Sequence, residues 1–178
     1  MNDDIPSRRK VLLVSWNLAS WRLLNPLLDQ GKLPHLNALI DEGIMGNLQT
    51  QRPLLEEVVF NSIATGTYAD KHGVLGPLEV GPQSNIRPTG SYSRRVDAMW
   101  DILSDCQHKC HVINFPLAVP AEKINGTFVA PVFFEKVPHR HQEKFEIPLV
   151  SVHPESELSE LAQFIVTLED IDAEVMSM

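Results

Sequence analysis

Residues 10–17, with the sequence KVLLVSWN, decide the expected fold of this chain. Four successive apolar residues that end at polar ones are typical of a strand covered on both faces, and therefore of a central strand in a parallel sheet. We expect a buried strand over residues 11–15. Asn17 then follows the carboxyl end of that strand, which is where open α/β sheets bind their ligands.

A second stretch completes this picture. Residues 62–74, SIATGTYADKHGV, predict the end of a helix at Gly66, followed by a short loop closed by Lys-His-Gly. Residues 53–57, PLLEE, lead directly into that helix. Because a helix N-terminus presents free backbone N–H groups to phosphate, a strand end beside a helix start points to phosphate or metal chemistry.

The rest of the chain alternates between helical and strand patterns, with no internal repeat. We expect helices from Ser20 to Gly31 and over residues 34–43, 58–64, 96–106 and 158–171. We expect strands over residues 44–50, 110–115, 128–130 and 132–134, and a long excursion over residues 67–96. Strands that alternate with helices predict an α/β fold, a three-layer sandwich with a mainly parallel sheet.

Composition excludes several classes of protein. The 178 residues are 43% hydrophobic and 21% charged, which is globular, and residues 1–9 form a polar tail that we expect to be disordered. The net charge is −8, and no Lys or Arg follows residue 154, so we expect no nucleic-acid partner. No apolar run approaches the roughly 20 residues that cross a membrane, and no signal peptide is evident. We therefore expect a cytoplasmic protein with no membrane contact.

Several motifs follow one another in a specific order. They are SWN at residues 15–17, GKLPHL at 31–36, PLL at 53–55, SIATG at 62–66, KHGV at 71–74, MWDIL at 99–103 and NFP at 114–116. Together they resemble the type I phosphodiesterase and nucleotide pyrophosphatase family of the alkaline phosphatase superfamily. The resemblance covers about residues 10–130. It implies an alkaline-phosphatase-like core over residues 10–178, incomplete here because further ligands come from the second half of the family's domain.

The resemblance also implies a chemistry. Members of the family hold two divalent metal ions, commonly zinc, and act on phosphodiesters or nucleotides. An Asp at the end of the first strand is a metal ligand, and this chain has Asn17 there. A Ser or Thr at the helix start is the nucleophile and also binds metal, and this chain has Glu56 there. Gly66, His72 and Gly73 belong to the family's structural motif.

Each substitution leaves two interpretations open. Asn17 is a remnant metal ligand or a polar residue that turns the chain out of a strand. Glu56 is a replacement metal ligand or an ordinary acid, favoured at a helix start by the helix dipole. Arg94 and Arg95 meet a phosphate or form a solvated pair, and His139 and His141 form a metal pair or an exposed loop.

Three functional hypotheses follow. The first is a metal-dependent phosphodiesterase or nucleotide pyrophosphatase-like hydrolase that is impaired in this chain. The second is a non-catalytic relative that acts as a binding module, since the hydroxyl nucleophile is missing. The third is a fragment whose exposed sheet edge makes it form a homo-oligomer.

Overall fold

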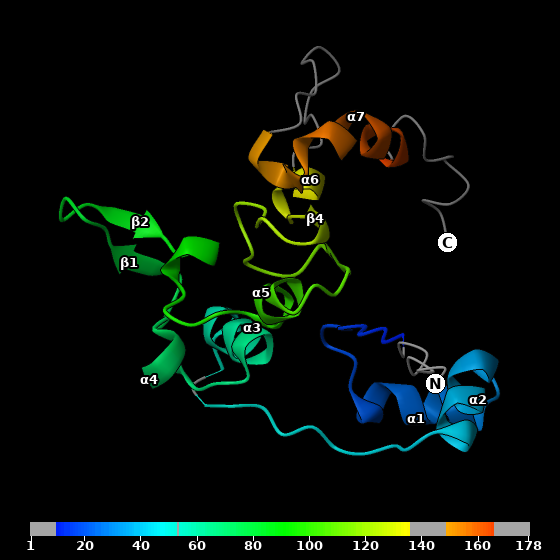
Figure 1. Cartoon of the computed structure of the whole chain (residues 1–178). Helices are drawn as coiled ribbons and strands as arrows, with labels where there is room; N and C mark the ends of the chain where they lie inside the picture. The colour runs from blue at the N-terminus through cyan, green and yellow to red at the C-terminus, as the bar shows by residue number, and fades with distance from the viewer. Residues whose placement is uncertain (1–9, 53, 136–148, 166–178) are drawn as a thin grey trace, which may run out of the picture. The chain divides into compact units, whose positions relative to one another are not determined.

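The computed structural model describes residues 10–52, 54–135 and 149–165. The chain divides into two compact units, Met1–Gln49 and Thr50–Met178, and each is described by itself. Helices alternate with short strands, so the fold class is α/β, as the sequence predicts (Figure 1). None of the helices in the described residues is long and apolar enough to span a membrane.

Two helices form the regular secondary structure in the described part of the first unit. Helix α1 (Trp21–Asp29) begins where the Ser20 hydroxyl accepts a hydrogen bond from the N–H of Arg22, at 3.3 Å. It is followed by Gly31 in the left-handed conformation, with φ of 67°. Helix α2 (Pro34–Glu42) begins at a proline and ends before Gly43. Both helices confirm the prediction, because their caps are local signals.

The two strands predicted for the first unit are absent. Residues 11–15 and 44–50 have no regular secondary structure, and side chains such as Val11 (90% exposed) and Leu48 (93%) lie in solvent. The prediction of a buried strand over residues 11–15 is therefore wrong for this structure. The apolar pattern is present, but a strand also needs a neighbour to pair with, and no described residue supplies one.

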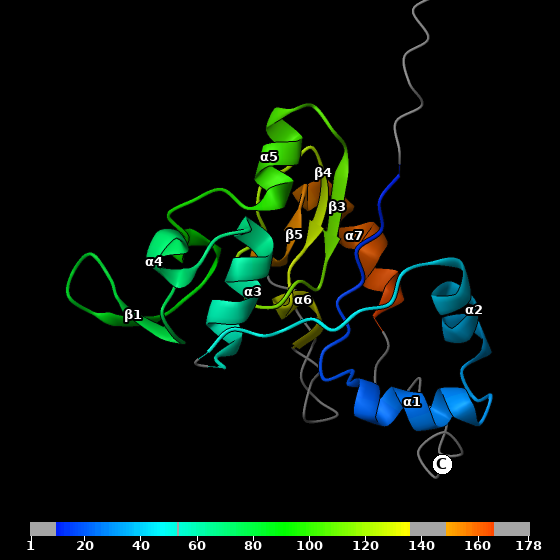
Figure 2. The ribbon, with the colours of Figure 1, turned by 90° about the horizontal axis from the view of Figure 1, so that it is seen from below.

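The second unit is built around a three-stranded sheet. The strands lie in the order β3 (Cys110–Ile113), β4 (Gly126–Val129) and β5 (Val152–His153), as Figure 2 shows. The β3–β4 pair is parallel and the β4–β5 pair is antiparallel, so this small sheet is mixed. The predicted strand over residues 110–115 is confirmed, although it ends two residues earlier.

One face of this sheet packs against α3 (Glu56–Thr65) and α5 (Met99–Asp105). The apolar cluster on this side contains Ala64 of α3, Trp100 of α5, and Val112 and Phe128 of the sheet. Helix α5 is shorter than predicted because it begins after Ala98, whose N–H donates to the Asp101 carboxylate at 2.9 Å. Helix α3 confirms the prediction and ends at Gly66 in the left-handed conformation.

The other face is covered by the end of the described chain. Val129, Val152 and Phe133 form its core, with Leu158 and Leu161 packed against them. Phe133 belongs to α6 (Val132–Glu135), so the strand predicted over residues 132–134 is wrong. Helix α7 (Leu158–Leu161) continues into the 3₁₀ turn Ala162–Phe164, and residues 166–171 of the predicted helix lie outside the described residues. Two further 3₁₀ turns flank β5, Leu149–Ser151 and Glu155–Glu157.

The predicted excursion over residues 67–96 contains structure of its own. It holds α4 (Ala69–His72), the antiparallel hairpin of β1 (Leu78–Val80) and β2 (Ile86–Pro88), and a 3₁₀ turn at Ser91–Ser93. The hairpin extends away from the β3–β5 sheet in both views (Figures 1 and 2). Glu79 and Arg87 form an ion pair on one of its faces, at 2.6 Å.

Candidate functional site

The start of α3 carries the residue predicted to stand at the nucleophile position. Glu56 is the first residue of this helix and is exposed, and Glu57 follows it in the first turn. Leu55 precedes them and makes no side-chain cap. Two carboxylates at a helix N-terminus stabilise the helix dipole. They also repel an anion, so this helix start does not favour phosphate by itself.

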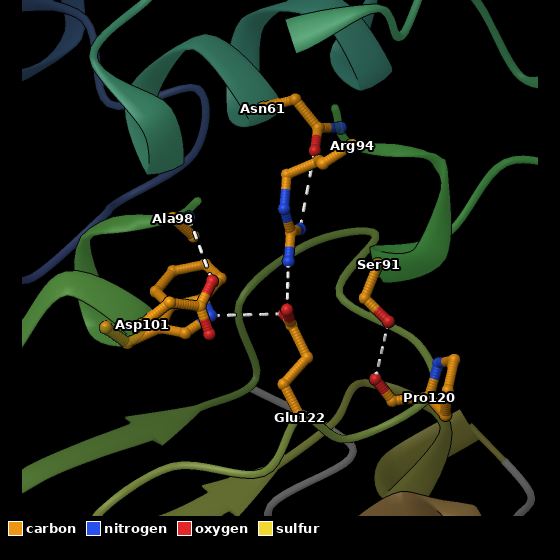
Figure 3. Close-up of polar contacts among 8 residues, drawn as sticks. Asn61, Ser91, Arg94, Ala98, Asp101, Pro120 and Glu122 are labelled. Atoms are coloured by element: carbon orange, nitrogen blue, oxygen red, sulfur yellow. Dashed lines mark hydrogen bonds and ion pairs between the residues drawn. The ribbon is translucent and has the colours of Figure 1, made fainter. Parts of the chain in front are cut away.

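A buried ion pair lies beside the same helix and contacts it at Asn61. Arg94 is paired with Glu122, and their side chains are only 4% and 17% exposed (Figure 3). Arg94 also reaches the side-chain oxygen of Asn61 on α3, at 3.5 Å. The indole N–H of Trp100 donates to the other oxygen of Glu122 at 3.1 Å, and Arg94 lies over the ring, 5.3 Å from its centroid. The pair therefore ties α3 and α5 to the loop that leads into β4.

This pair answers one question that the sequence left open. Arg94 neither meets solvent nor is free for a phosphate, because its guanidinium is already held by Glu122 and Asn61. Arg95 is exposed. Burial raises the pKa of the Glu122 carboxyl, and the hydrogen bond and charge of Arg94 oppose that shift. The Arg94–Glu122 pair therefore stabilises the packing of α3 and α5 and leaves neither side chain free to react with a substrate.

A second polar group connects the end of α3 to α4. The N–H of Val74 donates to Nδ1 of His72 at 3.1 Å, so the ring proton resides on Nε2. Nε2 lies 3.0 Å from the Ser62 hydroxyl, and that hydroxyl donates to Gln51 at 3.2 Å. Because Nε2 of His72 carries a proton, it cannot accept the hydroxyl proton of Ser62. Ser62 and His72 therefore do not form a pair of nucleophile and general base.

His72 is fully buried, and its surroundings disfavour its charged form. Burial is the main reason that its pKa lies below the usual value for histidine, and the positive charge of Arg94 lowers it further. The neutral ring is the form that accepts the hydrogen bond from Val74. Gly73 follows in the left-handed conformation, with φ of 80°, and a side chain there would collide with Arg95.

Asn17, the predicted remnant metal ligand, lies in the first unit. It is exposed and sits in a turn rather than at the end of a strand. A groove of about 630 Å³ lies nearby in the same unit, lined by Trp16, Trp21, Arg22 and other residues, but Asn17 is not among them. Asn17 and Glu56 belong to different units. That the two residues form one metal site therefore stays a prediction.

The described residues offer no ready metal site. Among them, no three His, Cys, Asp or Glu side chains are grouped to hold an ion. Asn17 is a neutral amide and a poor zinc ligand, and Glu56 and Glu57 at the start of α3 have no third potential ligand grouped with them among these residues. The residues that the structure describes therefore do not provide the ligand set that the family resemblance implies. His139 and His141 lie outside the described residues.

Sequence reasoning missed Glu122 and Asn61. The only signal for Glu122 was a single carboxylate between two apolar segments, and nothing local identified Arg94, 28 positions away, as its partner.

Comparison with known proteins gives one positive finding. No curated protein and no solved structure matches this chain. The family model of type I phosphodiesterases and nucleotide pyrophosphatases matches residues 11–172, nearly the whole chain. The matched residues include the strand expected over residues 11–15, the start of α3, the Lys-His-Gly turn, and strands β3 and β4. The chain therefore belongs to the type I phosphodiesterase and nucleotide pyrophosphatase family.

Proposed function

We propose that this chain is a phosphodiesterase or nucleotide pyrophosphatase-like hydrolase whose reaction is impaired by substitution at two positions. Membership of the family supports the reaction class. The single observation that carries the impairment is Glu56, exposed in the first turn of α3, where the resemblance implies a Ser or Thr nucleophile. A carboxylate there supplies no hydroxyl for attack on phosphorus.

The electrostatics of α3 support the same proposal. With Glu56 and Glu57 in its first turn, the helix start repels the phosphate that its backbone N–H groups would otherwise attract. Asn17 places a neutral amide, which is a poor zinc ligand, where the resemblance implies a charged carboxylate. A metal ion such as zinc, when bound, neutralises phosphate charge and activates the attacking oxygen. The metal ligand expected at Asn17 and the nucleophile expected at Glu56 are therefore the two groups that we propose this chain has replaced.

Restoring both groups tests the proposal. Asn17→Asp with Glu56→Thr should raise zinc- or manganese-dependent hydrolysis of a chromogenic phosphodiester by about tenfold or more, equivalent to about 1.4 kcal/mol of activation free energy. Asn47→Asp with Glu42→Thr makes the same two chemical changes at exposed positions of the first unit and should leave the rate unchanged. Equal rates in the unaltered chain and both double variants would refute the assignment of Asn17 and Glu56.

A non-catalytic binding module is the second candidate, and the missing hydroxyl at position 56 favours it. Titration calorimetry with zinc and manganese separates the two candidates. Stoichiometric binding of metal by the unaltered chain supports a retained metal site at Asn17 and Glu56. We propose that this site binds zinc. No measurable heat, together with binding of a nucleotide without turnover, supports the binding module. Action on small phosphodiesters or nucleotides and a location in the cytoplasm are also proposals.

A further inference from the structure

Two hydrogen bonds connect His72 to the segment that precedes α3. The Nε2–H of His72 faces the Ser62 hydroxyl at 3.0 Å, and that hydroxyl donates to Oε1 of Gln51 at 3.2 Å. A hydroxyl has one proton to donate, and a serine inside a helix commonly donates it to the carbonyl four residues earlier. Here the proton goes to Gln51 while the oxygen accepts from His72. All three residues belong to the second unit, so the link is complete within it.

This link fixes how the chain enters α3. Ser62 comes six residues after Glu56, the first residue of the helix, which places it about 9 Å along the helix axis. Gln51 comes five residues before Glu56, and its side chain nevertheless reaches Ser62. The side chain of Gln51 therefore lies alongside the helix. Its bond to Ser62 restrains the direction from which the chain arrives at Glu56.

A second set of contacts reaches the first turn of α3. The side-chain N–H of Asn61 donates to the Glu57 carbonyl at 2.7 Å, and its oxygen accepts from Arg94 (Figure 3). Arg94 is also the positive charge that acts on His72. A charge on His72 would repel the guanidinium that binds Asn61. The contact of Asn61 with Glu57, the residue next to position 56, therefore also depends on the charge of His72.

Protonation of His72 is incompatible with the observed hydrogen bonds. The added proton would go to Nδ1, which accepts from the N–H of Val74 at 3.1 Å, so two donors would face each other. The charged groups that act on the ring are Arg94, from the loop before α5, and Asp70 of α4. Burial and Arg94 lower the pKa of His72, whereas Asp70 and a hydrogen bond with the backbone of Val58 in α3 oppose that shift. The link is therefore intact in the neutral form.

We propose that His72 is a positioning residue: acting through Ser62, it holds Gln51 and so fixes the entry of the chain into α3. Residue 56 stands at this entry, and that it occupies the reacting position rests on the proposed function. The coupling between His72 and Gln51 does not depend on that function. In a chain whose nucleophile is restored, hydrolysis should require the neutral form of His72.

Nuclear magnetic resonance of the full chain tests the coupling without any activity. The ring nitrogen shifts report the ionisation of His72, and the side-chain amide of Gln51 reports its own hydrogen bond. We expect both to titrate at one midpoint below about 6.5, the usual pKa of histidine. In Ser62→Ala the His72 ring should still titrate, but the Gln51 amide should no longer follow it. Ser62→Thr keeps a hydroxyl and should preserve the joint titration.

Ser91→Ala is the matched control. Ser91 is another buried serine, and its hydroxyl donates elsewhere, to the Pro120 carbonyl at 2.8 Å. This variant should leave the titration of the Gln51 amide unchanged. A Gln51 amide that is insensitive to pH in the unaltered chain overturns the proposal, and that measurement needs no variant to fold. A Gln51 amide that follows His72 equally in Ser62→Ala also overturns it.

Kinetics connect the coupling to the reaction. In the chain with Asn17→Asp and Glu56→Thr, adding Ser62→Ala should lower kcat about tenfold with little change in KM, because the nucleophile is misplaced while substrate still binds. It should also remove the fall in kcat that protonation of His72 causes at low pH. Ser62→Thr should keep both the rate and the pH profile, and Ser91→Ala should change neither.

The two proposals fail separately in these experiments. No hydrolysis by the chain with Asn17→Asp and Glu56→Thr refutes the proposed function, and the resonance titration then decides the coupling. Hydrolysis whose kcat and pH profile are unaffected by Ser62→Ala overturns the positioning role of His72 and leaves the proposed function standing.

Discussion

The ionisation of His72 affects the stability of the second unit. The surrounding structure lowers its pKa, so the folded chain keeps it neutral at a pH where the unfolded chain, with a pKa near 6.5, becomes protonated. Between the lowered pKa and about 6.5 the unfolded state binds more protons. Stability is therefore complete above pH 6.5 and decreases as the pH falls below it.

Urea unfolding at pH 5.5 and pH 7.5 measures this effect. We expect the unaltered chain to be less stable at pH 5.5, with a slope of at most about 1.4 kcal/mol per pH unit from this group. His72→Asn keeps an acceptor for the N–H of Val74 but does not titrate, so it should lose that part of the slope. An identical pH dependence in both proteins would contradict the role of His72.

The Arg94–Glu122 pair predicts a large loss of stability at the same scale. Glu122→Gln should lower the free energy of unfolding by about 3 kcal/mol, because it leaves the buried Arg94 guanidinium without a counter-charge. Glu79→Gln, at the partly exposed pair with Arg87, is the control and should change stability by less than about 1 kcal/mol. Equal losses from the two variants, measured by urea denaturation, would contradict a special role for the buried pair.

The two cysteines should differ in reactivity. Cys106 is exposed, whereas Cys110 is partly buried at the start of β3, and burial raises the pKa of its thiol. Since the thiolate is the reactive form, a maleimide should label Cys106 first at pH 7. Mass spectrometry of the partly labelled protein locates the label, and preferential labelling of Cys110 would show that β3 is less protected than described.

At the scale of elements, two glycines should respond differently to alanine. Gly66 ends α3 with φ of 64° and has open space around it, so Gly66→Ala should cost about 1 kcal/mol from backbone strain alone. At Gly126, the first residue of β4, a Cβ would lie 2.0 Å from the Cys110 carbonyl oxygen. Gly126→Ala should therefore be much more destabilising, because it separates β3 from β4.

Thermal unfolding of these variants provides the comparison. Gly76→Ala is the control, since its backbone is not left-handed and no atom lies within 4 Å of the added Cβ. Its midpoint should remain close to that of the unaltered chain. If Gly126→Ala were no more destabilising than Gly66→Ala, that result would contradict the close packing of Gly126 in β4 against Cys110 in β3.

At the scale of the whole molecule, the two units differ in how much they bury. In the described part of the first unit no residue is fully buried, whereas the second unit has apolar clusters on both faces of its sheet. Amide hydrogen exchange should therefore be slowest in β3, β4 and α5 and fast over residues 44–50.

The sequence by itself determined what local chemistry controls. Ser20, Pro34 and Gly66 placed three helix ends, because caps act within a few residues of the backbone that they terminate. The ordered motifs indicated the family, which the match over residues 11–172 confirms. They also identified the two substituted positions, Asn17 and Glu56, whose roles stay predictions.

Tertiary structure decided everything that needs a partner distant in the chain. The apolar pattern of residues 11–15 predicted a strand, but a strand forms only where an edge receives it, and none does so in the described residues. Residues 132–134 became a helix because Phe133 packs against Val129 and Val152. Arg94 met Glu122 rather than phosphate or water, since a buried charge requires an opposite one, and only folding brings the two together.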